Sequence, residues 1–335
     1  MKEETQYNFT PLLNPIPISE QVWPEGILPL VSTSTLTYNH EPYIRECIEG
    51  ILMQKTTFPV RVCIFEDAST DKTAEIVKGY AKKYPDLIFA FCQQENTWGQ
   101  KEKRHVAGKP FNEVRNVAKY IALCEGDDYW TDPLKLQKQV GFMEKNTEYS
   151  ACFTNAEFIN EIDNWRKPFI KNRKQGDVNI RDIILKGGII YPTASILYRK
   201  HFLSRYISIP ELPGDALLIF NMADQGKVFF LNEFTCIYRR WHGGIYSRIS
   251  KNEIEKNKIR LKAIEGYKML NIHTNRKYEK HFKKTISRIS LILFTQSDFK
   301  NKIKYIKDIQ FAEYLRLPFL IAKKHIRRLI KSKNN

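Results

Sequence analysis

The chain has 335 residues, of which 42% are hydrophobic and 13% aromatic, and its formal net charge is +17. This composition is typical of a globular protein, and no stretch approaches the ~20 consecutive apolar residues of a membrane-spanning helix. The positive charge is confined to one end: residues 247–335 contain 24 Lys and Arg but 7 Asp and Glu, whereas residues 1–246 contain 30 of each sign. A polyanionic partner is therefore expected for the C-terminal segment alone.

The N-terminal segment, residues 1–27, contains four prolines that prevent a continuous helix, so an extended arm is predicted there. It lacks the apolar core of a secretory signal peptide, which favours a cytoplasmic location. The six cysteines stand singly, without a CxxC pair, and several lie inside apolar runs. They are interpreted as buried free thiols rather than as a zinc site or a disulfide framework.

Short apolar runs alternate with amphipathic segments along the body of the chain. Strands are predicted at residues 28–37, 60–65, 87–92, 121–124, 151–159, 189–198 and 227–238. Helices are predicted at residues 41–55, 72–83, 114–122, 133–146 and 215–225, and the pattern from residue 252 onward is helical and basic. This order predicts an α/β fold with parallel pairing and right-handed crossovers.

Three of the predicted strands end in loops that carry acidic side chains, at residues 37–41, 66–67 and 125–128. Ligands bind at the carboxyl ends of the strands in an open parallel sheet, so the three loops are expected to converge on one site. Carboxylates held close together repel one another unless a cation is present. Hard oxygen ligands suit Mn²⁺ or Mg²⁺, which take further ligands from substrate phosphates.

Within the third loop, both Asp127 and Asp128 are interpreted as functional, because they lie between a strand end and the aromatic pair Tyr129-Trp130. Asp71 and Asp132 are interpreted instead as helix caps or solvated loop residues. Lys101, Lys103 and Arg104 could reach substrate phosphates, but they fall in a polar stretch for which a solvated loop is the preferred prediction.

Together these segments resemble the inverting family 2 glycosyltransferases of the GT-A fold, a Rossmann-like mixed sheet flanked by helices. The resemblance covers about residues 28–247 and rests on STLTYNHEPYI, IFEDASTDKTAEI and the more specific ALCEGDDYWTDPLKLQKQ. It implies transfer of a sugar from a nucleotide-diphosphate donor with inversion. The domains expected from it are an N-terminal arm at 1–27, a glycosyltransferase domain at 28–247 and a basic helical region at 248–335.

The resemblance also implies where the donor lies. Thr37, Tyr38 and Glu41 would lie along the nucleoside. Asp67, preceded by Glu66, would accept a hydrogen bond from the base, usually uracil.

The metal ion is expected at Glu125-Gly126-Asp127, which stands where the family has its Asp-x-Asp motif. Asp127 would be a metal ligand. Glu125 has a longer side chain than the usual aspartate and would contact the metal less directly. The segment YRRWHGGIYS places Trp241 where such proteins often have a histidine, with His242 one residue later. His242 is therefore a candidate third ligand, with an ordinary loop histidine as the alternative.

An inverting transfer also requires a base that takes the proton of the acceptor hydroxyl. The resemblance puts this base at the start of a helix after the acceptor-binding segment, a position that Asp215 matches. A helix cap is the alternative for the same carboxylate.

The C-terminal segment interleaves apolar and basic residues over residues 311–331, interrupted near Pro318. An amphipathic basic helix of this kind can lie on an anionic membrane, which would make the protein peripheral on the inner face of the cell membrane and bring it to a lipid-linked acceptor. Packing of the helix on the body is the alternative. A nucleic-acid partner is not expected, because base-stacking aromatics in an RNA-binding arrangement are absent.

The function expected from the sequence is a glycosyltransferase of surface polysaccharide, lipopolysaccharide or other glycan synthesis, acting on a glycan or lipid-linked acceptor. Two other functions stay open. One is a catalytically silent nucleotide-sugar-binding partner subunit at the membrane. The other is a sugar nucleotidyltransferase, which would release pyrophosphate from a nucleoside triphosphate.

Overall fold

The computed structural model describes residues 7–187, 190–244, 247, 249, 252–296 and 305–310. The chain divides into two compact units. Unit 1 comprises residues 1–178, 191–206 and 222–242, and unit 2 comprises residues 179–190, 207–221 and 243–335. The predicted tail helix at residues 311–331 lies outside the described residues.

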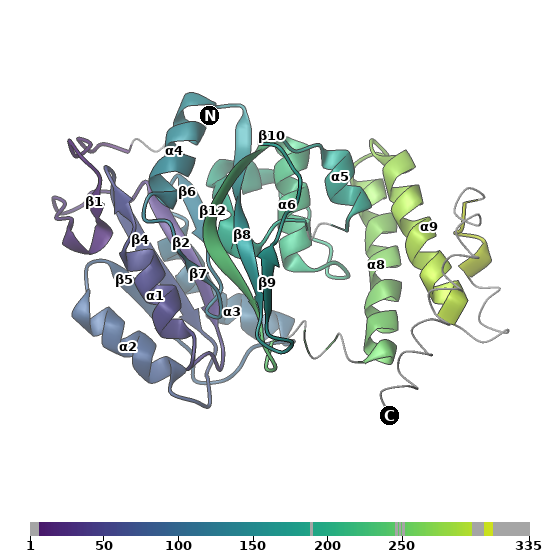
Figure 1. Ribbon diagram of the computed structural model, residues 1–335, viewed down its shortest axis with the longest axis horizontal. Coiled ribbons are helices and arrows are strands. Elements are labelled where there is room, and N and C mark those ends of the chain that lie inside the picture. The colour runs from purple at the N-terminus through teal and green to yellow at the C-terminus, as the bar shows by residue number, and fades with distance from the viewer. Residues whose placement is uncertain are drawn as a thin grey trace. The chain divides into compact units, whose positions relative to one another are not determined.

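Unit 1 is built on a mixed sheet that has ten strands in the described residues, ordered β10-β12-β8-β11-β6-β2-β4-β5, with β7 paired to β12 and β9 to β8 (Figure 1). The strands of its parallel half are β2 (Val31–Thr37), β4 (Val60–Glu66), β5 (Ile88–Cys92) and β6 (Tyr120–Leu123). They are connected by α1 (Ile44–Leu52), α2 (Thr73–Lys83) and α3 (Lys101–Arg115). The predicted alternation of strands and helices is confirmed for this half.

The helices cover both faces of the parallel half, as the alternation of side chains along β4 requires. Val62 and Ile64 belong to the core cluster that also contains the buried residues of α1 and α2. Cys63 and Phe65 point the other way and pack with Phe111 of α3.

The other half of the sheet contains longer strands of mixed direction. β8 (Tyr149–Asn160) runs parallel to β12 (Lys227–Arg240), and β11 (Leu197–Arg199) is antiparallel to both β6 and β8. The remaining elements of unit 1 are short, apart from α4 (Lys135–Lys145). They are β1 (Ile16–Pro17), β3 (Lys55–Thr56), β7 (Tyr129–Trp130), β9 (Trp165–Pro168), β10 (Gly176–Asp177) and the 3-10 helices Ile18–Glu20, Thr193–Ser195 and Lys200–Arg205.

Helix α1 packs directly on the backbone of β7. A methyl group on Gly50 of α1 would lie 2.7 Å from the carbonyl oxygen of Trp130 in β7, so only glycine allows this approach. β7 directly follows the acidic loop 125–128, and its position thereby fixes the end of that loop.

The sequence predictions were wrong in two segments of the chain. A helix was predicted at 114–122 and a loop around Lys101, but α3 spans Lys101–Arg115 and β6 begins at Tyr120. The helix was not predicted because it contains Pro110 and is largely polar. Its buried residues are Gly108 and Phe111. The long strand predicted at 189–198 is also not observed in its described residues, 190–198, because Pro192 leads into a 3-10 turn and the strand there spans only Leu197–Arg199. Residue 189 lies outside the described residues.

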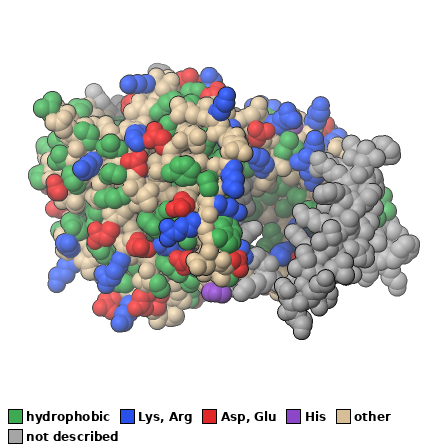
Figure 2. All heavy atoms as spheres, viewed as in Figure 1, with side chains coloured by type: hydrophobic (Ala, Val, Ile, Leu, Met, Phe, Trp, Pro, Cys, Tyr) green, Lys and Arg blue, Asp and Glu red, His purple; other side chains and the backbone are tan. Residues whose placement is uncertain are grey.

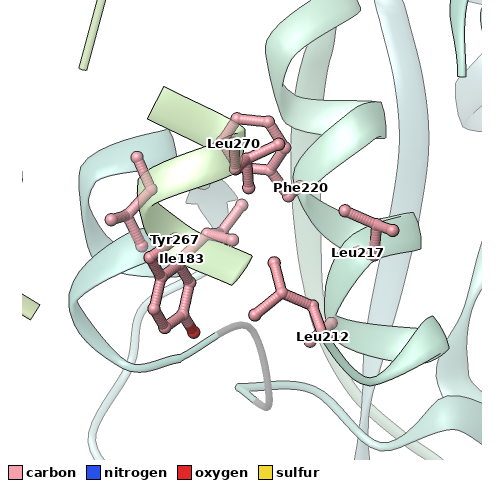
Figure 3. Close-up of a pocket in the computed structure, with 8 residues that line it drawn as sticks. Ile183, Leu212, Leu217, Phe220, Tyr267 and Leu270 are labelled. Atoms are coloured by element: carbon pink, nitrogen blue, oxygen red, sulfur yellow. The ribbon is translucent and has the colours of Figure 1, made fainter. Parts of the chain in front are cut away.

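Unit 2 is helical in its described residues. It contains α5 (Ile180–Leu185), α8 (Glu253–His273) and α9 (Glu279–Gln296), together with the first residues of α6 (Gly214–Gln225). Apolar side chains including Ile183, Leu212, Phe220, Tyr267 and Leu270 converge there (Figure 3). The cavity between them is about 10 Å³, the space of one water, so this is a packed core and not a ligand site. No helix in the described part of the chain is long and apolar enough to cross a membrane.

Candidate active site

The loops that follow β2, β4 and β6 meet at one end of the sheet, as the sequence predicted. Thr37 and Glu66 are paired in the parallel ladder, so β2 and β4 end at the same level. The backbone N–H of Asp67 donates to the carbonyl of Thr37 at 3.1 Å, and that of Gly126 donates to the carbonyl of Leu36 at 3.0 Å. These hydrogen bonds tie the three loops together.

Gly126 allows the closest of these approaches. A methyl group at this position would lie 2.5 Å from Thr37 Oγ1 and 2.7 Å from His40 Nδ1. Contacts this short require the neighbours to move, so any side chain at Gly126 would push the acidic loop away from the end of β2.

Asp127 projects from the acidic loop with about one-fifth of its side chain exposed. Its Oδ2 accepts a hydrogen bond from the indole Nε1 of Trp241 at 2.9 Å and lies 3.9 Å from His40 Nε2. Its Oδ1 has no hydrogen-bond partner among the described residues. Burial lowers the pKa of His40, although the nearby Asp127 charge opposes the shift, so burial favours a neutral ring here.

Asp128 has a structural role, which corrects the functional interpretation made from the sequence. It is buried, and its Oδ1 accepts a hydrogen bond from the backbone N–H of Arg239 in β12 at 2.9 Å. Burial raises the pKa of this carboxyl well above its ordinary value, and repulsion from Asp127 adds to the shift. Asp128 therefore fastens the loop to β12 and does not face a substrate.

Asp67 is almost fully buried and is held by side chains that sequence reasoning missed. Its Oδ1 accepts hydrogen bonds from the N–H and the hydroxyl of Thr97, at 2.9 and 2.7 Å. Arg104 Nη1 donates to Oδ2 at 2.7 Å, and its guanidinium lies over the ring of Phe65. Arg104, expected in a solvated loop, is thus the charge partner of the predicted base-binding carboxylate.

The neighbouring Glu66 is completely buried. Its Oε1 accepts a hydrogen bond from the Ser69 N–H at 2.7 Å, whereas its Oε2 has no hydrogen-bond partner in the described structure. An unsatisfied buried acceptor is costly, so Glu66 is a place where a bound ligand or water would supply a donor.

Glu41 and Tyr38 lie on the rim of the same end of the sheet. Glu41 Oε2 accepts from the Lys72 N–H at 3.1 Å, and the Glu41 N–H donates to Asp71 Oδ2 at 3.0 Å. Asp71 also accepts from the Thr73 N–H, which agrees with the capping role expected for it. Tyr38 is 41% exposed and free to contact a ligand.

The three candidate metal ligands are not brought together. The described residues contain no group of three or more His, Cys, Asp and Glu side chains arranged to hold a metal ion. Glu125 lies in the same loop as Asp127, but His242 follows β12 with its side chain exposed. Asp127 Oδ1 nevertheless fits one position of a Mn²⁺ or Mg²⁺ shell, since such ions take most other ligands from water and phosphate.

Asp215 lies in the first turn of α6, in unit 2, with its side chain half-buried. Its Oδ1 accepts a hydrogen bond from the N–H of Ala216 at 2.8 Å. A helix cap instead accepts from an N–H two or three residues later, so this contact with the next residue is not a capping hydrogen bond. It leaves the other carboxylate oxygen available for proton transfer.

The charges on the body are mixed. In Figure 2, Lys and Arg side chains are interspersed with Asp and Glu over the face of unit 1 that is turned to the viewer. A single-sign patch is absent from this face of the described residues, in agreement with the even charge count of residues 1–246.

Several proteins are similar to this chain. An uncharacterised protein of Mycobacterium tuberculosis is 36% identical over 220 residues, which cover 64% of this chain and 60% of that protein. The chain thus spans about 60% of the length of this relative. An uncharacterised glycosyltransferase of Methanocaldococcus jannaschii is 28% identical over 76% of this chain and 82% of its own length. The putative teichuronic acid biosynthesis glycosyltransferase TuaG of Bacillus subtilis is 32% identical over 36% of this chain and 45% of its own length.

Among solved structures, the complex of S. aureus TarS 1-349 with UDP-GlcNAc superimposes with a TM-score of 0.56 at 17% identity, covering 86% of this chain and 78% of that chain. This likeness confirms the predicted GT-A fold. The family model of Glycosyl transferase family 2 matches residues 32–206, more than half of the sequence and all three acidic loops. The chain therefore belongs to glycosyl transferase family 2.

Proposed function

We propose that the chain transfers a hexose-type sugar from a UDP-linked donor to a hydroxyl group of its acceptor, with inversion at the anomeric carbon. The observation that carries the proposal is the state of Asp127, which lies where three strand-end loops meet and has one oxygen fixed by Trp241 and the other free for a ligand. The UDP-GlcNAc complex of TarS, which shares the fold, supports a UDP-linked donor.

The nucleoside would lie along Thr37, Tyr38 and Glu41, with the base directed to the loop of Glu66 and Asp67. Asp67 accepts three hydrogen bonds from Thr97 and Arg104, whereas an ionised carboxylate has about four acceptor sites. One site thus stays open for the N–H of a uracil ring. Glu66 is proposed as a second donor-binding residue through its unsatisfied Oε2, which is buried in the free protein.

The diphosphate would lie at Glu125-Gly126-Asp127, in the domain proposed for residues 28–247. A divalent cation, Mn²⁺ or Mg²⁺, would stabilise the negative charge of the departing diphosphate when it is bound there. Asp127 would hold it through Oδ1, and Glu125 would contribute directly or through a water. His242 is exposed and does not form a three-residue metal group with these carboxylates in the described structure, so it is proposed only as a ligand that joins when the metal binds.

Asp215 is proposed as the base. It would take the proton of the acceptor hydroxyl while that oxygen attacks the anomeric carbon opposite the diphosphate. The proposed acceptor is a glycan or lipid-linked glycan of a bacterial-type surface polysaccharide, as the partial similarity to TuaG supports. The basic region at 248–335 would hold the protein on the anionic inner face of the cell membrane.

The proposal is tested by measuring UDP release from a panel of UDP-sugars in the presence of Mn²⁺. The wild type should hydrolyse or transfer at least one of them, and Asp127→Asn should reduce the rate by about 100-fold or more, as loss of one electrostatic group commonly does. Asp86→Asn is the matched control, because Asp86 is exposed in the turn before β5 and should keep wild-type activity. A folded wild type that is inactive with every nucleotide sugar, or that releases pyrophosphate from UTP instead, contradicts the proposal.

A further inference from the structure

A pocket in unit 1 beside Asp127 has no role in the proposed binding of the donor or in the proposed proton transfer. It holds about 360 Å³ and is lined by the start of α1, β7, the β8–β9 hairpin and the end of β12. This volume is within the range of small-molecule sites, about 300–1,000 Å³. We name it the Arg239 pocket, after the arginine that joins its charged groups.

Arg239 is held rigidly. Its side chain is 5% exposed, and its guanidinium lies 4.5 Å from the ring centroid of Tyr43 and 5.0 Å from that of Tyr129. Its Nη1 donates to the carbonyl oxygen of Asp127 at 2.9 Å. A ligand would therefore meet a preformed wall and would not have to order it.

The charges of the pocket are balanced. Arg239 Nη2 contacts Glu46 Oε2 at 2.7 Å, and its Nε lies 3.0 Å from Glu161 Oε1. The hydroxyl of Tyr43 donates to Glu161 Oε2 at 2.7 Å. Both glutamates are partly exposed, keep unused acceptor sites and pair with Arg239, and Arg166 adds a second positive charge to the pocket wall. Such a lining favours an uncharged ligand rich in hydroxyl groups over a polyanion.

The same pocket contains Trp165, a half-buried indole in β9. A flat aromatic ring packs against the C–H face of a sugar, while carboxylates and guanidinium groups bind its hydroxyls in pairs. We propose that the Arg239 pocket binds the saccharide part of the acceptor. This inference rests on the proposed transferase function and assigns its acceptor a site on unit 1.

Two residues that line the pocket, Tyr43 and Arg239, also contact the proposed donor site. The ring of Tyr43 lies 4.9 Å from that of Trp241, whose indole N–H binds Asp127. The guanidinium of Arg239 donates a hydrogen bond to the backbone carbonyl of Asp127. A saccharide in the pocket thus lies one side chain away from the residue proposed to hold the diphosphate.

The test is binding of the full chain to an array of microbial surface glycans in the presence of UDP and Mn²⁺. The wild type should bind at least one glycan, and Trp165→Ala should weaken that binding at least tenfold. Arg166→Ala provides an independent variant, because this arginine is largely exposed and its only ion pair in the described structure, with Glu157, is 4.0 Å long. Trp23→Ala is the matched control, a half-buried tryptophan of the N-terminal segment that should leave binding unchanged.

Calorimetric titration with UDP separates this inference from the proposed function. UDP affinity should be the same in all four proteins. A wild type that binds UDP but no glycan, or a glycan signal that both pocket variants retain, overturns the inference and leaves the donor site standing. Loss of UDP binding by the wild type itself would instead contradict the proposed function.

Discussion

Replacing Trp241 by Phe removes one hydrogen bond from the site and little else. The indole Nε1 lies 2.9 Å from Asp127 Oδ2, whereas the ring contacts with Tyr43 and His40, at 4.9 and 5.8 Å between centroids, can be kept by a phenyl ring. A hydrogen bond to a charged group contributes about 1.5–3 kcal/mol. If about 1.5–2 kcal/mol of this stabilises the oriented carboxylate in the transition state, kcat/KM should fall roughly 10- to 30-fold.

The assay is UDP release at saturating and limiting Mn²⁺, with folding checked by thermal denaturation. Trp241→Phe should require more Mn²⁺ for half-maximal rate, because Asp127 is no longer fixed. Trp241→His is the matched variant, since an imidazole N–H can restore the donor, and it should recover part of the rate. Activity of Trp241→Phe within twofold of wild type, with unchanged Mn²⁺ dependence, would show that the Trp241 hydrogen bond does not orient Asp127 for catalysis.

Three further substitutions test the structure. Gly126→Ala should lower the free energy of unfolding by about 1–3 kcal/mol in urea titrations, because its methyl group would meet Thr37 Oγ1 at 2.5 Å; unchanged stability would contradict the close approach. Arg104→Met should leave Asp67 without its charge partner, lower stability by about 1–3 kcal/mol and weaken UDP binding in calorimetry, whereas wild-type values in both would contradict the ion pair. Lys135 is fully buried, and burial lowers its pKa to about 8, so the unfolded chain binds more protons between pH 8 and about 10.4. Wild type should therefore gain roughly 2 kcal/mol of stability relative to Lys135→Met between pH 7.5 and 9.5, and parallel stability curves for the two proteins would refute this.

The sequence was sufficient to predict the parallel half of the sheet and the meeting of its loops. Buried strands such as β4 are continuous apolar runs, and the acidic residues directly follow them, so chain order and parallel pairing already place Glu66, Asp67 and Asp127 at one end. The sequence also showed that Trp241 stands where related proteins often have a histidine. The consequence of this difference was not visible, because only the folded chain brings β12 to the acidic loop.

What could not be predicted depends on contacts between distant residues. Asp127 and Asp128 are adjacent and chemically alike, yet one faces the site and the other binds the backbone of Arg239, more than 100 residues later. Arg104 reaches Asp67 because Phe111 anchors helix α3 on β4. This helix was not predicted because Pro110 lies within it. In both cases the role of the residue depends on a single hydrogen bond to a distant part of the chain, and the hydrophobic periodicity of the sequence carries no information on such a contact.

The role of Asp127 is tested most directly by a crystal structure of the chain soaked with UDP and Mn²⁺, with the metal located by its anomalous signal. We predict one manganese ion bound by Asp127 Oδ1 and by oxygens of both phosphates, with Trp241 still bonded to Oδ2. A well-ordered UDP whose diphosphate lies away from Asp127, with that carboxylate in contact with neither metal nor phosphate, would contradict this role.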